Sequence, residues 1–371
     1  MKFLFTCGGT AGHINPALGL AGRLRELMPD AEFLFIGAKG QMEAELVPRE
    51  GFPMETVEIS NLSRSLSLAG LKHNARTARL LLKSRGEARA ILKRFQPDVA
   101  VGTGGYVCYP ALRQAHALGI PTLVHEANAV PGLTTKMLSR SVDRVLLGFE
   151  QAAQNYPKRA KTVFTGTPVR RDFARLDRAA ARRALGLDPA RPLVVSVWGS
   201  LGSDHINGLM PDFVRLAAQR RSFDLIHSAG QRGFPRLSAA VGDLEALRRE
   251  GIDLRAYIYD MPVVMAAADL VLCRSGASTL AELAVLGKPA LLVPSPNVTA
   301  HQQERNSALM ERLGAARVLL EGSFDAAGLY DAAEALVRDR SALEAMSRAM
   351  RESGNAAATE RICDLILSFV T

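Results

Sequence analysis

Short hydrophobic runs alternate with helical patterns along the whole chain. Most of these runs are continuously apolar, which is typical of parallel strands covered on both faces. The predicted strands are Lys2–Thr6, Glu32–Ile36, Val99–Gly102, Thr122–His125 and Arg144–Leu147 in the first half, and Leu193–Trp198, Asp224–His227, Leu254–Ile258, Leu270–Cys273 and Ala290–Val293 in the second. The pattern predicts an α/β fold with a doubly wound sheet in each half.

The segments between these strands carry the 3.6-residue hydrophobic period of helices. Pro16–Met28 predicts a helix that begins at its proline, because proline is well tolerated in the first turn. Thr279–Leu286 predicts a second helix, which Gly287 would close.

One stretch between the halves lacks any strand-like run. Residues 167–192 are rich in arginine and alanine, which is typical of a solvated helix with a linker. We therefore expect two domains, residues 1–165 and 166–355. The terminal segment 356–371 is helical in pattern, and we expect it to pack back on the first domain.

The composition is that of a protein with substantial cores. Hydrophobic residues make up 48% of the 371 positions and charged residues 22%, which argues against disorder. The four cysteines are isolated, which excludes a disulfide framework or a zinc ribbon and favours a reducing compartment. The opening apolar run is too short for a signal peptide, and no run of 18 apolar residues occurs. We expect a cytosolic chain without a transmembrane helix.

The net charge is +9, with 46 basic and 37 acidic residues. Nucleic acid, an anionic membrane surface or phosphorylated ligands would each explain such a charge. Aromatic residues amount to only 6%, and no helix-turn-helix, RNP or zinc-finger spacing occurs. We therefore expect no nucleic-acid partner.

Four glycine-rich loops each follow a predicted strand and precede a helical segment. They are Gly8–His13, Gly102–Tyr106, Gly199–Ser203 and Arg274–Thr279. Glycine lets a backbone approach a ligand closely, and free N–H groups at a helix start favour negative charge. Because ligands of open α/β sheets bind at the carboxyl ends of strands, two such loops per half predict a phosphate-handling cleft between the domains.

The loops match none of the common nucleotide motifs. The absence of G-x-x-x-x-G-K-[ST] excludes a P-loop NTPase, and no G-x-G-x-x-G supports a dinucleotide dehydrogenase. No D-x-D pair occurs, which argues against a sugar nucleotide held by a carboxylate-bound metal. We expect no metal site and no cofactor, with divalent cation assistance left open. Cations such as Arg170 would neutralise the phosphate.

Polar residues suited to a sugar nucleotide follow the last loop. Glu282, near the start of its helix, would either complement the helix dipole or bind a ribose diol through both oxygens. Gln302 and Gln303 are either surface residues or amides that recognise sugar hydroxyls, since an amide both donates and accepts.

Seven segments of the chain resemble the motifs of one enzyme family. In order they are G-G-T-A-G-H-I-N-P-A, M-E-A-E-L-V-P, G-T-G-G-Y-V, H-E-A-N-A-V-P-G-L-T-T-K, G-T-P-V-R, C-R-S-G-A-S-T-L-A-E-L and H-Q-Q-E-R-N-S-A. From residue 3 to about residue 361 the chain resembles the bacterial glycosyltransferases that make lipid II, the undecaprenyldiphospho-muramoylpentapeptide β-N-acetylglucosaminyltransferases of peptidoglycan synthesis. The number and order of the motifs make the resemblance highly specific.

The resemblance implies a GT-B fold, in which two Rossmann-like domains face an interdomain cleft. It implies inverting transfer of N-acetylglucosamine from UDP-N-acetylglucosamine, bound by the second domain, to a lipid-linked muramyl pentapeptide (lipid I), bound by the first. The acceptor group would be the muramyl 4-hydroxyl. The resemblance also implies peripheral attachment to the cytoplasmic face of the plasma membrane, and partners among cell-wall synthesis and division proteins.

The resemblance also assigns expected roles to residues that match its motifs. The donor would be contacted by Thr10 and Gly12 in the first loop, Asn128 at the sugar, Arg170 and Ser200 at the diphosphate, Ile258 and Met261 at the uracil, Glu282 at the ribose, and Gln302 and Gln303 at the sugar hydroxyls. Trp198 stands where a glycine is usual near the phosphate approach, and its bulk could alter the fit of the donor.

Transfer needs a group that makes the acceptor hydroxyl nucleophilic and a stabilised UDP leaving group. Loop N–H groups, helix starts and Arg170 would stabilise the leaving group. His13 is either the general base or a residue that only orients backbone and diphosphate. Glu126 is the alternative base.

Residues 64–94 mix leucines with arginines and lysines. An apolar stripe flanked by cations fits shallow insertion beside anionic lipid headgroups, but a core-facing amphipathic helix fits the same pattern. The basic charge and the lipid acceptor favour attachment to an anionic membrane surface.

Two other functions fit parts of the same pattern. A UDP-N-acetylglucosamine 2-epimerase would share the two-lobed architecture and would turn over the UDP-sugar alone. A module that only binds nucleotide sugar or anionic lipid would keep its ligand affinity when His13 is replaced, because it has no chemistry to lose.

Overall fold

The structure, a computed structural model, describes residues 1–60, 68–174, 176–199, 202–298 and 301–370. The chain forms two compact units. Unit 1 comprises Met1–Arg170 with Ala357–Thr371, and unit 2 comprises Arg171–Ala356.

Unit 1 is built on a seven-stranded parallel sheet in the order β3-β2-β1-β4-β5-β6-β7. Its strands are β1 (Lys2–Thr6), β2 (Glu32–Ala38), β3 (Met54–Val57), β4 (Val99–Gly102), β5 (Thr122–Glu126), β6 (Arg144–Leu147) and β7 (Thr162–Phe164). Its helices are α1 (Ala11–Leu27), α2 (Glu43–Arg49), α3 (Leu68–Phe95), α4 (Cys108–Ala117), α5 (Leu133–Leu138), the 3-10 helix η1 (Glu150–Asn155) and α16 (Ala358–Leu367). Apolar residues of α3, α4 and α5 pack on one face of the sheet, and those of α1, α2 and α16 pack on the other.

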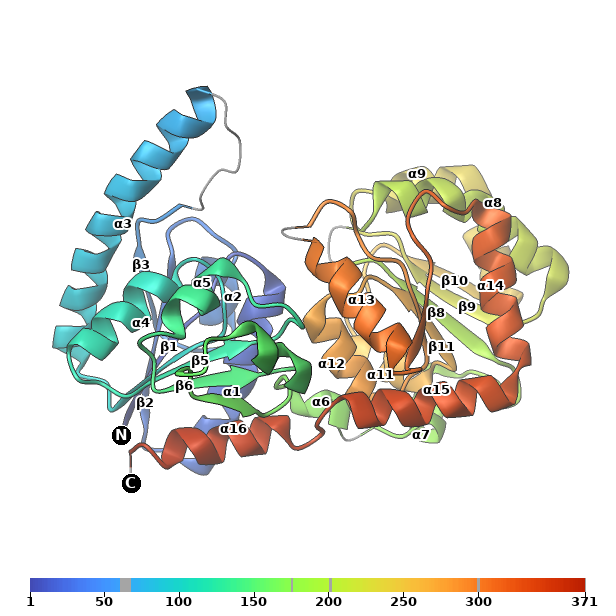
Figure 1. Cartoon of the computed structure of the whole chain (residues 1–371). Helices are drawn as coiled ribbons and strands as arrows, with labels where there is room; N and C mark the ends of the chain where they lie inside the picture. Colours follow the sequence, from blue (N-terminus) through green and yellow to red (C-terminus); the bar gives the residue numbers. More distant parts are fainter. Residues whose placement is uncertain (61–67, 175, 200–201, 299–300, 371) are drawn as a thin grey trace. The chain divides into compact units, whose positions relative to one another are not determined.

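The terminal helix α16 lies against α1 within unit 1 (Figure 1). Ile362 and Ile366 are fully buried in the core that α1 shares with the sheet. Arg23 of α1 pairs with Glu360 at 2.8 Å between nitrogen and oxygen. The last helix therefore completes one face of the first unit.

Unit 2 is built on a six-stranded parallel sheet in the order β10-β9-β8-β11-β12-β13. Its strands are β8 (Leu193–Val197), β9 (Asp224–Ser228), β10 (Ile252–Arg255), β11 (Leu270–Cys273), β12 (Ala290–Leu292) and β13 (Ala316–Val318). Its helices are α6 (Arg171–Ala174), α7 (Arg178–Leu185), α8 (Asp204–Arg220), α9 (Phe234–Val241), α10 (Leu244–Arg249), α11 (Met261–Ala267), α12 (Ala277–Leu286), α13 (Gln302–Arg312), α14 (Ala326–Arg338) and α15 (Arg340–Ser353). Apolar residues of α8, α9 and α14 form one core with the strands.

Both sheets have a doubly wound order, which confirms the predicted α/β class. The sequence pattern missed β3, β7 and β13, which are the outermost strands of their sheets. An edge strand has one neighbour and needs no continuous apolar run, as M-E-T-V, T-V-F and A-R-V show. At another edge, β10 ends at Arg255, so the predicted strand Leu254–Ile258 is displaced.

The start of α1 differs from the prediction by five residues. The helix begins at Ala11, directly after its N-cap Thr10, and Pro16 is buried inside it. Gly9 has φ +88° and completes the turn out of β1, which allows the helix to start at once. The predicted end of α12 is confirmed, because Gly287 closes the helix in the left-handed conformation.

The arginine-rich stretch is not solvated throughout. Arg182 of α7 is 1% exposed and pairs with Asp269 at 2.6 Å. It also donates to the carbonyl oxygens of Ala267, Asp188 and Arg191. Burial lowers the pKa of Arg182, and these partners hold the guanidinium in the core of unit 2.

Candidate functional site

The four glycine-rich loops lie at two equivalent places in the fold. The strand order reverses between β1 and β4 in unit 1, and between β8 and β11 in unit 2. The loops follow these four strands, whose ends are level through the pairings Thr6–Gly102 and Val197–Cys273. A doubly wound sheet binds its ligands at such a reversal. Each unit therefore has one pair of adjacent loops at the expected binding edge.

In unit 1 the two loops are tied to each other and to Glu43. The Gly8 N–H donates to the Gly104 carbonyl at 3.2 Å, and the Gly9 N–H donates to the Glu43 carboxylate at 3.0 Å. A Cβ on Gly105 would lie 2.2 Å from the Gly8 oxygen, so the close approach requires glycine. Both of these N–H groups are used within the protein, so the N–H groups that this loop could offer to a phosphate are those at the start of α1.

His13 is the third residue of α1, and its imidazole is held by this pair of loops. Its Nδ1 lies 3.1 Å from the Gly8 carbonyl oxygen. Because a carbonyl oxygen only accepts, Nδ1 carries the proton in this contact, and Nε2 of the neutral ring keeps its lone pair. The ring lies against Gly104, where a Cβ would be 2.4 Å from Cδ2. Nε2 is thus the nitrogen through which a neutral His13 would act as a general base.

Glu126, at the end of β5, is 5% exposed and accepts three hydrogen bonds. Its Oε1 accepts from the backbone N–H of Asn128 at 3.1 Å and from the side-chain amide at 2.9 Å. Its Oε2 accepts from the Gly132 N–H at 2.9 Å. These bonds favour a role in holding Asn128 over the role of general base.

His125, next to Glu126, is a packing residue. It is fully buried, and burial lowers its pKa to about 4. Its Nε2 lies 3.1 Å from the Gly166 carbonyl oxygen and donates to it. A neutral ring fixed in the sheet core is not placed to serve as a catalyst.

The other candidates of unit 1 lie at element ends. Thr10 is exposed at the start of α1, and its hydroxyl lies 3.4 Å from Nδ1 of His13. Gly12 is the second residue of the same helix and is half-buried. Arg170 is exposed at the end of the first segment of unit 1. The structure thus brings Thr10 and Gly12 together with His13.

In unit 2, α12 begins at the fourth loop without a side-chain cap. Its N-cap is Gly276, and its first turn holds no acidic residue. The N–H groups at such a helix start attract anions. Glu282 follows Ser278 by four residues, on the same helix face and about 6 Å along the axis. Because the dipole acts within the first turn, this position favours the ribose role for Glu282.

Arg274 ties the two loops of unit 2 together. Its guanidinium donates to the Ser203 hydroxyl at 2.7 Å and to the Val293 carbonyl at 3.0 Å, and it pairs with Glu321. Since Ser203 is the N-cap of α8, Arg274 links the third loop to the fourth. In the sequence, the only indication that Arg274 has such a linking role is that it belongs to the C-R-S-G motif.

The first residues of α13 are anchored to the fourth loop. Gln303 accepts from the Ser295 N–H through Oε1 at 2.8 Å, and its carbonyl accepts from the Ser275 hydroxyl at 2.8 Å. Asn306, a residue to which sequence reasoning assigned no role, donates to the Ser275 carbonyl at 3.1 Å. The Oε1 of Gln303 is therefore held within the protein, and Gln302 beside it is half-buried.

The residues expected at the uracil lie between β10 and α11. Ile258 is 3% exposed, so its side chain is not accessible to a ligand. Met261 is the first residue of α11 and is half-buried. Ser200, expected at the diphosphate, lies outside the described residues.

Trp198 points into the core of unit 2. Its side chain is 3% exposed and packs in the cluster that contains Ile206 and Met210 of α8. Its indole N–H donates to the Ser196 hydroxyl at 2.8 Å, and this oxygen lies 2.9 Å from Nδ1 of His227. The Arg274 guanidinium lies 5.7 Å from the centroid of the ring. The side chain of Trp198 is therefore a core side chain that is held next to the residue linking the two loops.

Two family models match the chain. Residues 3–147 match the glycosyltransferase family 28 N-terminal domain, and residues 193–362 match the glycosyltransferase family 28 C-terminal domain. The chain belongs to glycosyltransferase family 28. The first match lies within unit 1, and the second begins at β8 of unit 2.

Relatives of this family 28 glycosyltransferase carry a specific name. A protein of Acetivibrio thermocellus named UDP-N-acetylglucosamine--N-acetylmuramyl-(pentapeptide) pyrophosphoryl-undecaprenol N-acetylglucosamine transferase is 41% identical over 366 residues, which are 99% of this chain and 97% of that protein. A protein of Listeria welshimeri with the same name is 37% identical over 374 residues and covers both chains fully.

Solved structures support the GT-B fold of this family 28 glycosyltransferase. MurG of Acinetobacter baumannii superposes with a TM-score of 0.76 at 26% identity, over 99% of each chain. The UDP-GlcNAc 2-epimerase of Neisseria meningitidis gives a TM-score of 0.64 at 15% identity, over 99% of this chain and 100% of that one, which shows a shared fold alone.

The described part of this glycosyltransferase has neither a cluster of metal ligands nor a helix suited to span a membrane. No group of three or more His, Cys, Asp or Glu side chains there is placed to hold a metal ion. None of the helices there combines the length and the apolar character needed to cross a membrane.

Proposed function

We propose that this family 28 glycosyltransferase transfers N-acetylglucosamine from UDP-N-acetylglucosamine to the muramyl 4-hydroxyl of lipid I, with inversion, and so forms lipid II. The observation that carries the proposal is the 41% identity, over 99% of the chain, to a transferase named for this donor and acceptor. The chemistry of the two loop pairs supports it.

The donor is assigned to unit 2. The uncapped start of α12 would hold the diphosphate, and Glu282 would bind the ribose one turn further along the helix. The uracil would meet the backbone of Ile258, with Met261 against it. Gln302 and Gln303 would bind the sugar hydroxyls, with Ser200 and Arg170 at the phosphates and Thr10, Gly12 and Asn128 at the sugar.

The acceptor is assigned to unit 1, with His13 as general base. Nε2 of His13 would take the proton of the 4-hydroxyl as its oxygen forms a bond to C1 of the donor sugar. The bond between C1 and the β-phosphate oxygen breaks, and UDP leaves with the electron pair. Attack from the face opposite UDP inverts the configuration at C1. Glu126 acts by holding Asn128 in place.

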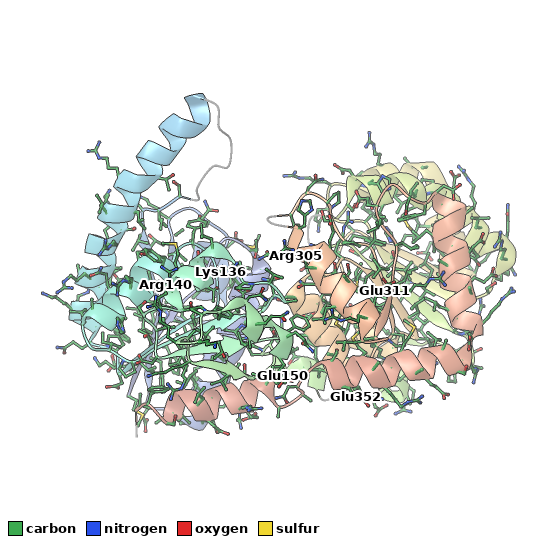
Figure 2. The ribbon with its side chains drawn as sticks, viewed as in Figure 1. Lys136, Arg140, Glu150, Arg305, Glu311 and Glu352 are labelled. Carbon is green, nitrogen blue, oxygen red and sulfur yellow. The ribbon has the colours of Figure 1, made fainter. Side chains whose placement is uncertain are left out.

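Attachment to an anionic membrane surface is a further part of the proposal. Leu82 of α3 is 68% exposed and Leu133 of α5 is 61% exposed. Lys136 of α5 and Arg140, which follows the end of this helix, are exposed and labelled in Figure 2. Apolar side chains beside cations suit shallow insertion among anionic headgroups, which would bring the enzyme to its lipid acceptor at the cytoplasmic face of the plasma membrane. Residues 64–67 of the predicted membrane segment 64–94 lie outside the described residues.

Flotation with vesicles tests this attachment. Binding to vesicles that contain anionic lipid, weakened by Leu133→Ser and by Lys136→Glu, is the expected result. Equal binding to neutral and anionic vesicles would contradict it. Partners among cell-wall synthesis and division proteins stay a prediction of the resemblance.

Release of UDP tests the reaction itself. We expect UDP to appear only when UDP-N-acetylglucosamine and a lipid-linked muramyl pentapeptide are both present. His13→Ala should lower turnover at least about tenfold with little change in UDP-sugar affinity. Conversion of the UDP-sugar without acceptor would point to an epimerase, and binding without any turnover would point to a binding module.

A further inference from the structure

Glu43 is a buried carboxylate to which the proposed function assigns no role. It is the first residue of α2, its side chain is 0% exposed, and no cation pairs with it among the described residues. Its Oε1 accepts from the Ala38 N–H at 2.9 Å, and its Oε2 accepts from the Gly9 N–H at 3.0 Å. A buried carboxylate without a cation is costly compared with an apolar side chain, which calls for a functional reason.

Two glycines make room for this carboxylate. A Cβ on Gly8 would lie 2.3 Å from Oε1 of Glu43, and a Cβ on Gly37 would lie 2.6 Å from its Cγ. Neither position tolerates a side chain while Glu43 keeps its place. The first glycine loop is therefore built around Glu43, 34 residues further along the chain.

Glu43 and His13 bind opposite sides of one peptide group. The N–H of Gly9, which Glu43 accepts, and the carbonyl of Gly8, which accepts from Nδ1 of His13, belong to the same planar amide. Fixing the N–H side of a planar group also fixes the direction of its carbonyl. A carboxylate on the N–H further polarises the carbonyl and makes it a better acceptor, because hydrogen bonds in a chain strengthen one another.

We propose that Glu43 is a positioning residue that acts on His13 through the Gly8–Gly9 peptide group. It holds the carbonyl of Gly8 toward Nδ1, so that the neutral ring carries its proton on Nδ1 and has its lone pair on Nε2. The consequence for turnover rests on the proposed function, in which Nε2 accepts the proton of the acceptor hydroxyl. The consequence for the tautomer does not.

Two substitutions at position 43 test this effect on His13 by removing different numbers of acceptor oxygens. Glu43→Met removes both acceptor oxygens at similar size, and Glu43→Gln keeps one. Glu45, exposed on the same helix, provides the matched controls Glu45→Met and Glu45→Gln. The full-length protein labelled with ¹⁵N-histidine reports the tautomer, because protonated and unprotonated ring nitrogens resonate far apart. Loss of a signal in His13→Gln assigns His13 among the seven histidines.

We expect Glu43→Met to shift the His13 signals toward the Nε2–H tautomer and to lower kcat at least about tenfold. The KM for UDP-N-acetylglucosamine should stay within about twofold, because no donor group is assigned to Glu43. Glu43→Gln should lie between the wild type and Glu43→Met, and both Glu45 variants should match the wild type.

Unchanged His13 nitrogen signals in folded Glu43→Met would overturn the proposal, as would an unchanged kcat. If Glu43→Met does not fold, Glu43→Gln carries the same test with one acceptor lost. Absence of transfer by the wild type would instead sink the proposed function, and the nitrogen signals would still decide what Glu43 does to His13.

Discussion

Gly104→Ala displaces the imidazole of His13 without changing its chemistry. The new Cβ would lie 2.4 Å from Cδ2 and 2.9 Å from Nε2 of His13, whereas ordinary contact begins at 3.4 Å. The ring must therefore move by about 1.0 Å, the difference between 3.4 and 2.4 Å. Because a displacement of about 1 Å at a reacting group can cost about 100-fold in rate, we expect kcat to fall by about that factor.

Backbone strain is the effect that must be separated from this displacement. Gly104 has φ +120°, and an alanine there costs about 1–3 kcal/mol. Gly119, in the same unit, has φ +76° and no atom within 4 Å of a Cβ, so Gly119→Ala adds strain without a contact. Each kcal/mol lowers Tm by about 2–4 °C in a unit of this size.

Steady-state kinetics with both variants decides the matter. We expect both to lose a few degrees of Tm, and only Gly104→Ala to lose kcat, with the KM for the UDP-sugar unchanged. A folded Gly104→Ala protein with wild-type kcat would refute the argument that the position of the His13 ring governs turnover. Equal losses of kcat in the two variants would assign the effect to strain.

Three further predictions follow from unit 2. Glu282→Ala should weaken UDP binding by about 10- to 100-fold, the worth of a charged hydrogen bond, and equal affinity by calorimetry would refute the ribose role. Burial lowers the pKa of His227 to about 3. As the pH falls, this histidine is therefore protonated near pH 6.5 in the unfolded chain but only near pH 3 in the native protein. The contribution of His227 to the free energy of unfolding is fully present above about pH 6.5 and is lost by about 1.4 kcal/mol per pH unit as the pH falls toward 3. Urea unfolding at several pH values should therefore show a free energy that depends less on pH in His227→Gln than in the wild type. An equal pH dependence in the two proteins would contradict the argument. Trp198→Phe should lower the free energy of unfolding by about 1–2 kcal/mol, because the hydrogen bond to Ser196 is lost, and should leave the affinity for the UDP-sugar unchanged. A changed affinity, measured by calorimetry, would show that this side chain does affect the fit of the donor.

The sequence predicts the parts of the fold that follow from local pattern. Central strands such as β1 and β11 are buried on both faces, so their continuous apolar runs identify them. The glycine-rich turns that follow these strands are also local patterns, and they indicate the edge of the sheet at which ligands bind. The edge strand β7 escapes prediction because T-V-F needs no distinct pattern when one side faces no partner.

What the sequence does not predict depends on contacts between distant segments. The N–H of Gly9 is taken by Glu43, a partner 34 residues away, and nothing local distinguishes it from an N–H that is free for phosphate. The same holds for Trp198, whose neighbours in the core come from α8. Glu282 could be placed on its helix, but its distance from the helix start depends on where that helix begins. Motifs locate the site, and tertiary contacts decide what each residue does there.

Mass spectrometry of the lipid product tests the central claim most directly. The protein is mixed with UDP-N-acetylglucosamine and a short-chain lipid-linked muramyl pentapeptide, and NMR of the product determines the anomeric configuration. We predict that the lipid gains one N-acetylhexosamine in β linkage and that one UDP is released for each lipid modified. If the lipid stays unmodified while the UDP-sugar still stabilises the protein against heat, the proposed donor site would stand, but transfer to lipid I would be contradicted.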